Sequence, residues 1–304
     1  MAFRASSTIE FSGISKRFGG VVAVNDLTFT VEPGVVTGFL GPNGAGKTTT
    51  LRMLLGLVRP TSGSATFGGS AYHELAQPLS TVGTALEASS FHPGRSGRNH
   101  LRVYAAAAGI DDGRVANVLE TVGLSEFADR KVGGYSMGMR QRLGLAFALL
   151  GDPGVLVLDE PSNGLDPEGI RWMRGFLRSL AEDGRTVLIS SHVLSEVQQS
   201  VDRVVIIRRG SSVFQGSLDA LETGSHVNVD AVDRAALARI LLAAGAAVHD
   251  VEGMLRVTGV GVEQVGELAL SAGIPLRHLA AEHVGLEEVF LDLVGDADSS
   301  GDSA

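Results

Sequence analysis

The sequence predicts an α/β fold with a mixed central sheet, an antiparallel β subdomain, a helical subdomain and a small C-terminal α/β appendage. Three observations support this prediction. An apolar strand at 35–40 runs into a glycine-rich turn and then a helical pattern at 48–58. Two further apolar strands, at 155–159 and 186–191, flank a helical stretch near 168–181, which favours a right-handed crossover between parallel neighbours. The first forty residues alternate apolar and polar positions, as antiparallel strands do.

The order of the remaining elements suggests two domains and a tail. Residues 89–150 have a helical pattern with glycine-rich breaks, and 201–216 predict a hairpin that turns at Arg209–Gly210. Beyond residue 216 the pattern becomes strand, helix, strand, helix and a short last helix, GLEEVFLDLV. We therefore expect one domain over 1–220, a small α/β domain over 221–296, and a disordered polar tail over 297–304.

Composition restricts the class of protein. The 304 residues are 44% hydrophobic and 19% charged, which is typical of a globular protein. The formal charge of −9 argues against a nucleic-acid surface. The chain has no cysteine, which excludes disulfides and thiolate metal sites. No signal peptide is expected at the N-terminus, and the most apolar stretch, 240–248, is too short to cross a bilayer.

Residues 41–48 read Gly-Pro-Asn-Gly-Ala-Gly-Lys-Thr and fit the pattern G-x-x-x-x-G-K-[ST]. Glycines let backbone N–H groups converge on phosphate oxygens, and the helix that follows directs its positive end at the same anion. We expect Lys47 to reach the β- and γ-phosphates and the Thr48 hydroxyl to bind Mg²⁺. The alternative is a chance glycine-rich turn, which the strand before it and the helix after it disfavour.

Two carboxylates, Asp159 and Glu160, end the apolar strand at 155–159. Alone, they are an ordinary solvated acidic turn. Beside a phosphate-binding loop, Asp159 can hold Mg²⁺ through water, and Glu160 can polarise the water that attacks the γ-phosphate. The sequence therefore predicts magnesium-dependent hydrolysis of a nucleoside triphosphate.

With these two motifs in place, residues 9–216 resemble the nucleotide-binding subunit of ABC transporters. Residues 135–139 (Tyr-Ser-Met-Gly-Met), followed by 140–143 (Arg-Gln-Arg-Leu), resemble the family signature and its basic extension. Residues 162–166 resemble the segment after the catalytic glutamate. His192 resembles the family's switch histidine, and Phe18 stands where the family stacks a ring on adenine. Glu87 falls where the family usually has a glutamine that senses nucleotide and faces the membrane partner. Each feature is weak alone, but together they follow the family's order.

The resemblance implies a P-loop NTPase fold of ABC type, with ATP and Mg²⁺ as cofactors. It implies a head-to-tail dimer, either a homodimer or a heterodimer with a second ATPase subunit, that encloses two ATP molecules. The implied catalytic residues are Glu160, His192 and Lys47, and the implied metal ligands are Thr48, Asp159 and Glu87. The residues implied to bind ATP are Phe18, Gly41, Asn43, Gly44, Ala45, Gly46, Lys47, Thr48, Thr49, Ser136, Gly138 and Met139, the last three acting from the opposite subunit.

The resemblance also implies a separate transmembrane permease subunit, whose coupling helix would enter a groove in the helical region 89–150. The chain would then lie at the cytoplasmic side of the cell membrane as a peripheral subunit. Residues 82–101 and the segment GLEEVFLDLV look most like the branch that exports drugs, antibiotics and peptides. The transported molecule is not predicted, because its pathway lies in the permease.

Two departures from the family pattern affect the expected site. Met137 and Met139 replace the typical glycine and glutamine of the signature, while Ser136 and Gly138 keep its hydroxyl and close backbone. Glu87 replaces a glutamine. A carboxylate cannot donate a hydrogen bond, so coupling to the permease is expected to be tuned differently.

Three other functions stay open at this stage. A soluble ABC-type ATPase acting on ribosomes or DNA would usually carry two cassettes or a long coiled-coil insertion. This chain has one cassette, no sustained heptads and an acidic balance. An importer subunit shares the same cassette, and a nucleotide-gated regulatory module would use the same site.

Overall fold

The computed structural model describes residues 6–86, 91–194, 198–222, 226–251 and 253–282, together with residues 290 and 293. The chain divides into two compact units, Met1–Leu218 and Asp219–Ala304. Each unit has a hydrophobic core of its own. The division falls at the start of the short helix α8 (Leu218–Glu222).

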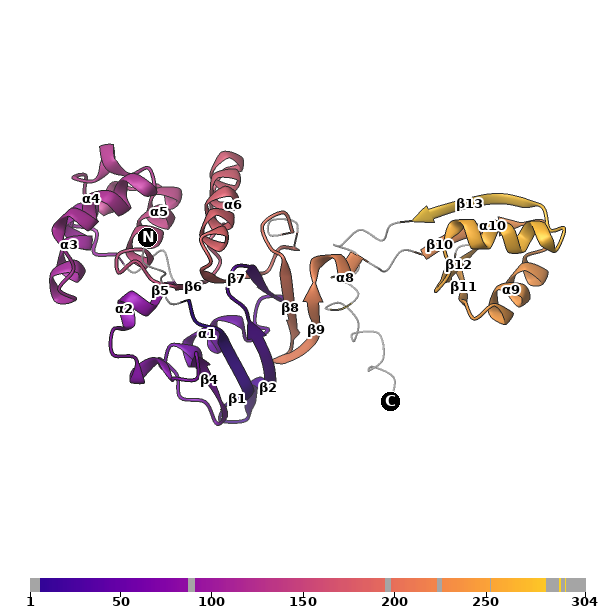
Figure 1. The fold of residues 1–304 in the computed structure, drawn as a ribbon, viewed down its shortest axis with the longest axis horizontal. Helices are drawn as coiled ribbons and strands as arrows, with labels where there is room; N and C mark the ends of the chain where they lie inside the picture. The colour runs from indigo at the N-terminus through magenta and orange to yellow at the C-terminus, as the bar shows by residue number, and fades with distance from the viewer. Residues whose placement is uncertain are drawn as a thin grey trace. The chain divides into compact units, whose positions relative to one another are not determined.

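The central sheet of the first unit has the strand order β5-β6-β7-β3-β8-β9 (Figure 1). The strands are β3 (Val36–Leu40), β5 (Val82–Ala85), β6 (Val155–Leu158), β7 (Thr186–Ser191), β8 (Arg203–Arg208) and β9 (Ser211–Ser217). The first five in this order run parallel, and β9 pairs antiparallel with β8. Strands β3, β6 and β7 are buried along their whole length, as is typical of a parallel sheet covered on both faces. The predicted parallel pairing of β6 and β7 is confirmed.

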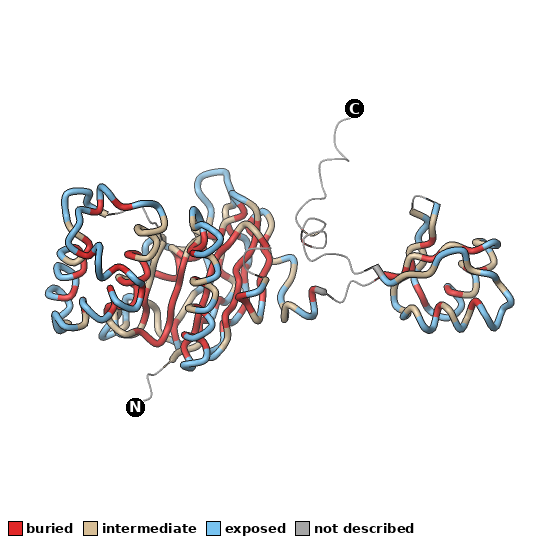
Figure 2. Tube along the Cα trace, turned by 90° about the horizontal axis from the view of Figure 1, so that it is seen from above, coloured by how far each residue is buried: buried red, intermediate tan, exposed pale blue. Residues whose placement is uncertain are grey.

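A second sheet is antiparallel and has the order β2-β1-β4, as the alternation near the N-terminus predicts. Its strands are β1 (Ile9–Phe18), β2 (Val21–Val31) and β4 (Ser62–Phe67). Stacked rings join it to the central sheet: the Phe11 and Phe29 centroids lie 4.2 Å apart, and those of Phe29 and Phe39 lie 5.3 Å apart. Figure 2 shows the buried residues running along the strands of this unit.

The helices of the predicted helical region gather beside the central sheet (Figure 1). They are α3 (Gly97–Ala107), α4 (Asp112–Thr121) and α5 (Met137–Ala148), with the 3-10 turns η2 (Ser125–Phe127) and η3 (Val132–Gly134) between α4 and α5. Ser96, Asp111 and Ser136 each cap the following helix by accepting a hydrogen bond from a backbone N–H in its first turn. These caps satisfy donors that a helix cannot satisfy by itself.

Other helices connect the strands of the first unit. They are α1 (Lys47–Leu54), α2 (Pro78–Thr81), α6 (Pro167–Glu182) and the 3-10 turn η1 (Tyr72–Glu74). The helical pattern of 48–58 extends past the end of α1, because Gly56 takes a left-handed conformation with φ 70° and turns the chain. The predicted hairpin of β8 and β9 is present, and both turn residues have positive φ, 47° at Arg209 and 83° at Gly210.

The second unit has the element order βαββαβ. Its elements are β10 (His226–Ala231), α9 (Arg234–Ala243), β11 (Ala247–Val251), β12 (Met254–Thr258), α10 (Val262–Ser271) and β13 (Leu276–Glu282). The sheet is antiparallel, with the order β11-β12-β10-β13. This is the ferredoxin-like arrangement.

The sequence pattern of this unit missed two strands. Gly253, with φ 83°, turns the chain sharply, so that one expected strand is the hairpin of β11 and β12. The strand β13 is the second strand that the sequence pattern did not predict. Apart from residues 290 and 293, the expected last helix at 285–294 lies outside the described residues, as does the tail at 297–304. None of the helices in the described part of the chain combines the length and apolar character needed to cross a membrane.

Candidate functional site

The carboxyl ends of three neighbouring strands bring the predicted site residues together. Leu40 at the end of β3 pairs with Ser191 at the end of β7, and Leu158 of β6 pairs with Ile189 of β7. Loop 41–46, the pair Asp159–Glu160 and His192 follow these strand ends directly. In an open sheet of parallel strands, this edge is where ligands bind.

Glycine is required in the loop for steric reasons. A Cβ at Gly41 would lie 2.4 Å from the carbonyl oxygen of Ile207 in β8. Gly46 has φ 106°, and a Cβ there would lie 2.5 Å from the carbonyl oxygen of Ala23. The loop can therefore pass between β2 and β8, and α1 can begin at Lys47, only if residues 41 and 46 are glycines. The first backbone N–H groups of α1 then end at the loop, where they can bind an anion.

Lys47 lies at the centre of the site. Its ammonium Nζ donates to the carbonyl of Gly41 at 2.7 Å and to that of Pro42 at 3.3 Å. It also lies 3.4 Å from Glu160 Oε1. The side chain is only 6% exposed, so its charge acts in surroundings where water screens it weakly. Lys47 therefore joins the glycine loop to the carboxylate that follows β6.

Thr48 and Asp159 form an oxygen pair beside the loop. The Thr48 hydroxyl donates to Asp159 Oδ2 at 2.8 Å. The other carboxylate oxygen, Oδ1, accepts a hydrogen bond from the hydroxyl of Ser190, the fifth residue of β7. Hard oxygen ligands of this kind suit Mg²⁺, which usually takes one or two protein oxygens together with water and phosphate.

Glu160 is held in an uncommon backbone conformation. Its φ is 50°, in the left-handed region that few non-glycine residues adopt. Its Oε2 lies 2.9 Å from Nδ1 of His192, while its Oε1 faces Lys47. The carboxylate is thus oriented by one group on each oxygen, and it keeps partial exposure to solvent, at 23%.

The residues of the predicted signature lie apart from this cluster. The Ser136 hydroxyl accepts a hydrogen bond from the backbone N–H of Met139, 3.2 Å away, at the start of α5. In the described residues, no hydrogen bond or ion pair joins Ser136, Gly138 or Met139 to Lys47 or to a carboxylate of the cluster. Met137 is 48% exposed and lies against Gly164, where a Cβ would come within 2.6 Å of Met137 Cγ.

Phe18 presents an exposed ring at the end of β1. Its side chain is 51% exposed, and the ammonium of Lys16 lies 4.9 Å from the ring centroid. An exposed aromatic ring can stack on a base. Glu87, the predicted third metal ligand, lies outside the described residues.

Two residues contact the site that the sequence analysis did not name as site residues. Ser190 bonds to both acidic positions: it donates to Asp159 and accepts from the backbone N–H of Glu160 at 2.9 Å. Gln141 of α5 donates to the carbonyls of Glu160 at 3.4 Å and of Asn163 at 3.1 Å. The sequence offered one indication of Ser190: it has a hydroxyl near the end of the predicted strand at 186–191, which neighbours the strand that leads to Asp159 and Glu160.

A glycine loop that leads into a helix, with a lysine, a threonine hydroxyl and two carboxylates at one sheet edge, defines a P-loop nucleotide hydrolase. Comparison with known proteins places the chain more narrowly. Residues 24–163 match the protein family described as ABC transporter. Residues 225–287 match a second family, described as a domain of unknown function (DUF8746).

Some curated relatives match almost the whole chain. The bacitracin transport ATP-binding protein BcrA of Bacillus licheniformis is 37% identical over 300 residues, which are 95% of this chain and 98% of that protein. The Nod factor export ATP-binding protein I of Burkholderia lata is 38% identical over 296 residues, which are 94% of this chain and 97% of that protein. The chain belongs to the ABC transporter family of ATP-binding subunits.

Solved structures agree with this assignment. The structure titled "Structure of ATP binding subunit of ABC transporter" aligns with a TM-score of 0.64 and 26% identity, over 71% of this chain and 92% of that one. These comparisons confirm the predicted family and the ABC-type P-loop fold. They also confirm that the chain is an ATP-binding, ATP-hydrolysing transporter subunit.

Proposed function

We propose that this chain drives the export of an antibiotic or a peptide, as the ATP-hydrolysing subunit of a transporter whose permease is a separate chain. The observation that carries the proposal is the cluster of Lys47, Thr48, Asp159, Glu160 and His192 at one sheet edge. Names of relatives that refer to bacitracin transport and Nod factor export support the direction of transport. The ATPase would span 1–220, on the cytoplasmic side of the membrane.

In this proposal, loop 41–46 and α1 bind the nucleotide. The ammonium of Lys47 would exchange the carbonyls of Gly41 and Pro42 for the β- and γ-phosphate oxygens. Thr48 and Asp159, whose oxygens lie 2.8 Å apart, fit Mg²⁺ as one direct ligand and one partner through water. When bound, the cation would neutralise phosphate charge. The exposed ring of Phe18 would stack on adenine.

Glu160 is the general base in this proposal. Its carboxylate would accept a proton from the water that attacks the γ-phosphate. His192, 2.9 Å from Oε2, would keep the carboxylate in place and contact the γ-phosphate. Because Lys47 contacts Oε1 at 3.4 Å, ATP binding would draw the lysine toward phosphate and free that oxygen for water.

The start of α5 would complete the site of a second subunit. Ser136 and the N–H groups of Gly138 and Met139 stand at a helix N-terminus, which favours phosphate. Within one chain the Met139 N–H donates to the Ser136 hydroxyl, and among the described residues none of the three groups bonds to the cluster. A head-to-tail dimer would bring each α5 onto the ATP held by its partner, and hydrolysis would remove the charge that holds the two subunits together.

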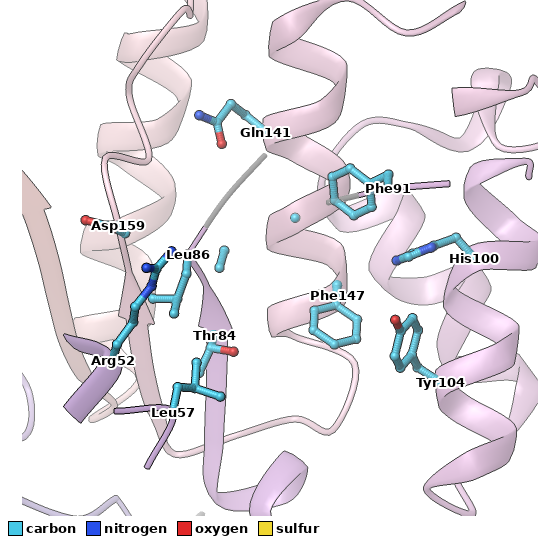
Figure 3. Close-up of a pocket in the computed structure, with 12 residues that line it drawn as sticks. Arg52, Leu57, Thr84, Leu86, Phe91, His100, Tyr104, Gln141, Phe147 and Asp159 are labelled. Atoms are coloured by element: carbon cyan, nitrogen blue, oxygen red, sulfur yellow. The ribbon is translucent and has the colours of Figure 1, made fainter. Parts of the chain in front are cut away.

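A groove between the central sheet and the helical region would receive the permease (Figure 3). The groove has a volume of about 330 Å³. The residues that line it are Arg52, Leu57, Thr84, Ala85, Leu86, Phe91, His100, Tyr104, Gln141, Gly144, Phe147 and Asp159. Its lining includes Gln141, which bonds to the backbone of Glu160, so a segment in the groove would lie close to the catalytic glutamate.

Affinity purification of a tagged Glu160→Gln chain tests the proposal. The protein is purified with ATP from detergent-solubilised native membranes, and its partners are identified by mass spectrometry. We expect a membrane protein with several predicted spans in stoichiometric amount. Recovery with ribosomal proteins, or with no membrane protein, would contradict the proposal and favour a soluble ATPase.

A further inference from the structure

Gly210, in the turn between β8 and β9, bonds to two other segments with its two peptide groups. Its N–H donates to the carbonyl of Ala45 in loop 41–46, with 2.9 Å between nitrogen and oxygen. Its carbonyl accepts from the backbone N–H of Asn25 in β2, at 2.8 Å. Gly210 therefore joins the proposed phosphate loop to β2.

The loop, the turn and β2 meet at one backbone oxygen, the carbonyl oxygen of Ala23. A Cβ at Gly46 would lie 2.5 Å from this oxygen, and a Cβ at Gly210 would lie 2.8 Å from it and 3.0 Å from Cα of Val24. Gly210 also has φ 83°, which glycine adopts without strain and other residues rarely adopt. A side chain at position 210 would therefore force the turn and β2 apart.

Asn25 and Ser211 also hold the turn on β2. Asn25 Nδ2 donates to the Ser211 hydroxyl at 3.2 Å, and this hydroxyl donates to the Asn25 carbonyl at 3.5 Å. Loop 41–46 rests on the same turn through the carbonyl of Ala45. The position of the loop relative to β2 thus depends on the turn that lies between them.

The strand β2 leads to the ring that we propose as the adenine contact. It begins at Val21, which pairs with Phe18 across the hairpin of β1 and β2. ATP would contact the ring of Phe18 with its base and loop 41–46 with its phosphates. Since one ligand spans both contacts, a shift of the loop relative to β2 changes the fit of ATP.

We propose that Gly210 is a positioning residue that sets the spacing between the phosphate loop and the adenine contact. It acts through the backbone of Ala45 and Asn25. A ligand held at two points binds more tightly when their spacing is fixed before it arrives. The inference rests on the proposed function, which assigns adenine to Phe18. It implies selection for a whole adenine nucleotide over a triphosphate group alone.

Inorganic triphosphate distinguishes the spacing from the shape of the loop, because it can contact loop 41–46 without contacting Phe18. Binding of ATP to the full chain is measured by isothermal titration calorimetry. The inhibition constant of inorganic triphosphate is measured by its competition with ATP hydrolysis. We expect Gly210→Ala to weaken ATP binding and raise KM about tenfold, because the added carbon forces close-packed atoms apart. The inhibition constant of inorganic triphosphate and kcat at saturating ATP should stay unchanged.

Gly69→Ala is the matched control for backbone strain. Gly69 has φ 84°, and a Cβ there meets no heavy atom within 4 Å apart from its chain neighbours. We expect this variant to melt at a lower temperature than wild type but to bind ATP with wild-type affinity. If Gly210→Ala does not fold, Ser211→Ala takes its place. It removes the side-chain bonds to Asn25, and we expect about threefold weaker ATP binding, again without an effect on inorganic triphosphate.

Two results would overturn the inference alone. Wild-type ATP affinity in the folded variant would show that the spacing does not depend on the turn. Equal losses for ATP and inorganic triphosphate would show that the turn shapes the loop itself. Phe18→Ala tests the adenine contact separately: wild-type ATP affinity in that variant would overturn this part of the proposed function and the inference with it. Failure of inorganic triphosphate to inhibit the wild-type chain would contradict the proposed phosphate loop.

Discussion

The hydroxyl of Ser190 accepts a hydrogen bond from the backbone N–H of Glu160, with 2.9 Å between the two atoms. The same hydroxyl donates to Asp159, and Ser190 is fully buried. On its other side, the carbonyl of Glu160 accepts from Gln141. Positive φ values of a non-glycine residue are unfavourable by about 1–3 kcal/mol and persist only where the surroundings hold them. Ser190 and Gln141 therefore hold the peptide groups of the proposed base in place.

Ser190→Ala is expected to lower kcat for ATP by about 10- to 100-fold, because a displaced base loses its alignment with the attacking water. It should also raise the Mg²⁺ concentration needed for half-maximal activity, since Asp159 loses a donor that orients it. Steady-state kinetics across Mg²⁺ concentrations measure both effects. Ser190→Thr keeps the hydroxyl on a strand and should recover most of the activity. Wild-type kcat in the alanine variant would show that Ser190 has no positioning role.

Lys47→Ala is expected to weaken ATP binding by about 100-fold, because charge-assisted hydrogen bonds to phosphate are lost. Isothermal titration calorimetry on the isolated chain measures this. The chain has three lysines, and exposed Lys131 gives a matched control: Lys131→Ala should bind ATP like wild type. Equal affinities of the two variants would exclude Lys47 from phosphate binding.

Glu160→Gln is expected to lower turnover by at least about 100-fold while ATP still binds, because an amide cannot accept the proton from water. Size-exclusion chromatography with light scattering should then show an ATP-dependent dimer. Glu120→Gln makes the same change at an exposed position of α4 and should leave turnover unchanged. Rapid turnover by Glu160→Gln would assign the base to another residue.

Asp152 lies outside the candidate site, and its ion pairs are expected to stabilise the fold. It lies 2.9 Å from Arg114 and 3.3 Å from the buried Arg185. Asp152 has φ 58°, a conformation that asparagine also tolerates. Asp152→Asn should therefore lower the free energy of unfolding by about 2–3 kcal/mol through loss of charge. Urea unfolding measures this change. The control is Asp183→Asn, at the exposed end of α6, which should unfold like wild type. Equal free energies of unfolding for Asp152→Asn and Asp183→Asn would contradict the prediction.

The sequence predicted the parts of the site that are encoded locally. The glycine loop between β3 and α1 and the carboxylates after β6 each lie within a few residues of one strand. Because parallel strands place their carboxyl ends at one edge, the meeting of Lys47 with Glu160 followed from the element order. The contacts of Ser190 and Gln141 did not follow from it. A serine in a strand and a glutamine in a helix are ordinary residues until the fold brings them to Glu160.

The second unit shows a different limit of sequence patterns. Its strands β11 and β12 have five residues each, and β11 has no buried side chain, so β11 lacks the apolar alternation of a half-buried strand. The turn depends on the positive φ of Gly253, and a lone glycine does not distinguish a turn from a bulge. The strand β13 is recognised mainly by its pairing with β10, which is not visible in the local sequence.

Ser136→Ala tests whether α5 acts on the nucleotide of a second subunit. The change removes a helix cap, which by itself lowers stability by about 1 kcal/mol. Ser96 caps α3 in the same way, with 3.3 Å between its hydroxyl and the backbone nitrogen of Asn99, so Ser96→Ala is a control with a similar loss of stability. We expect Ser136→Ala to lose hydrolysis and ATP-dependent dimerisation, while the monomer still binds ATP, because its hydroxyl lies away from the cluster of its own chain. Ser96→Ala should keep hydrolysis. If Ser136→Ala abolished binding of ATP by the monomer, the hydroxyl would belong to the site of its own chain, and the head-to-tail arrangement would be wrong.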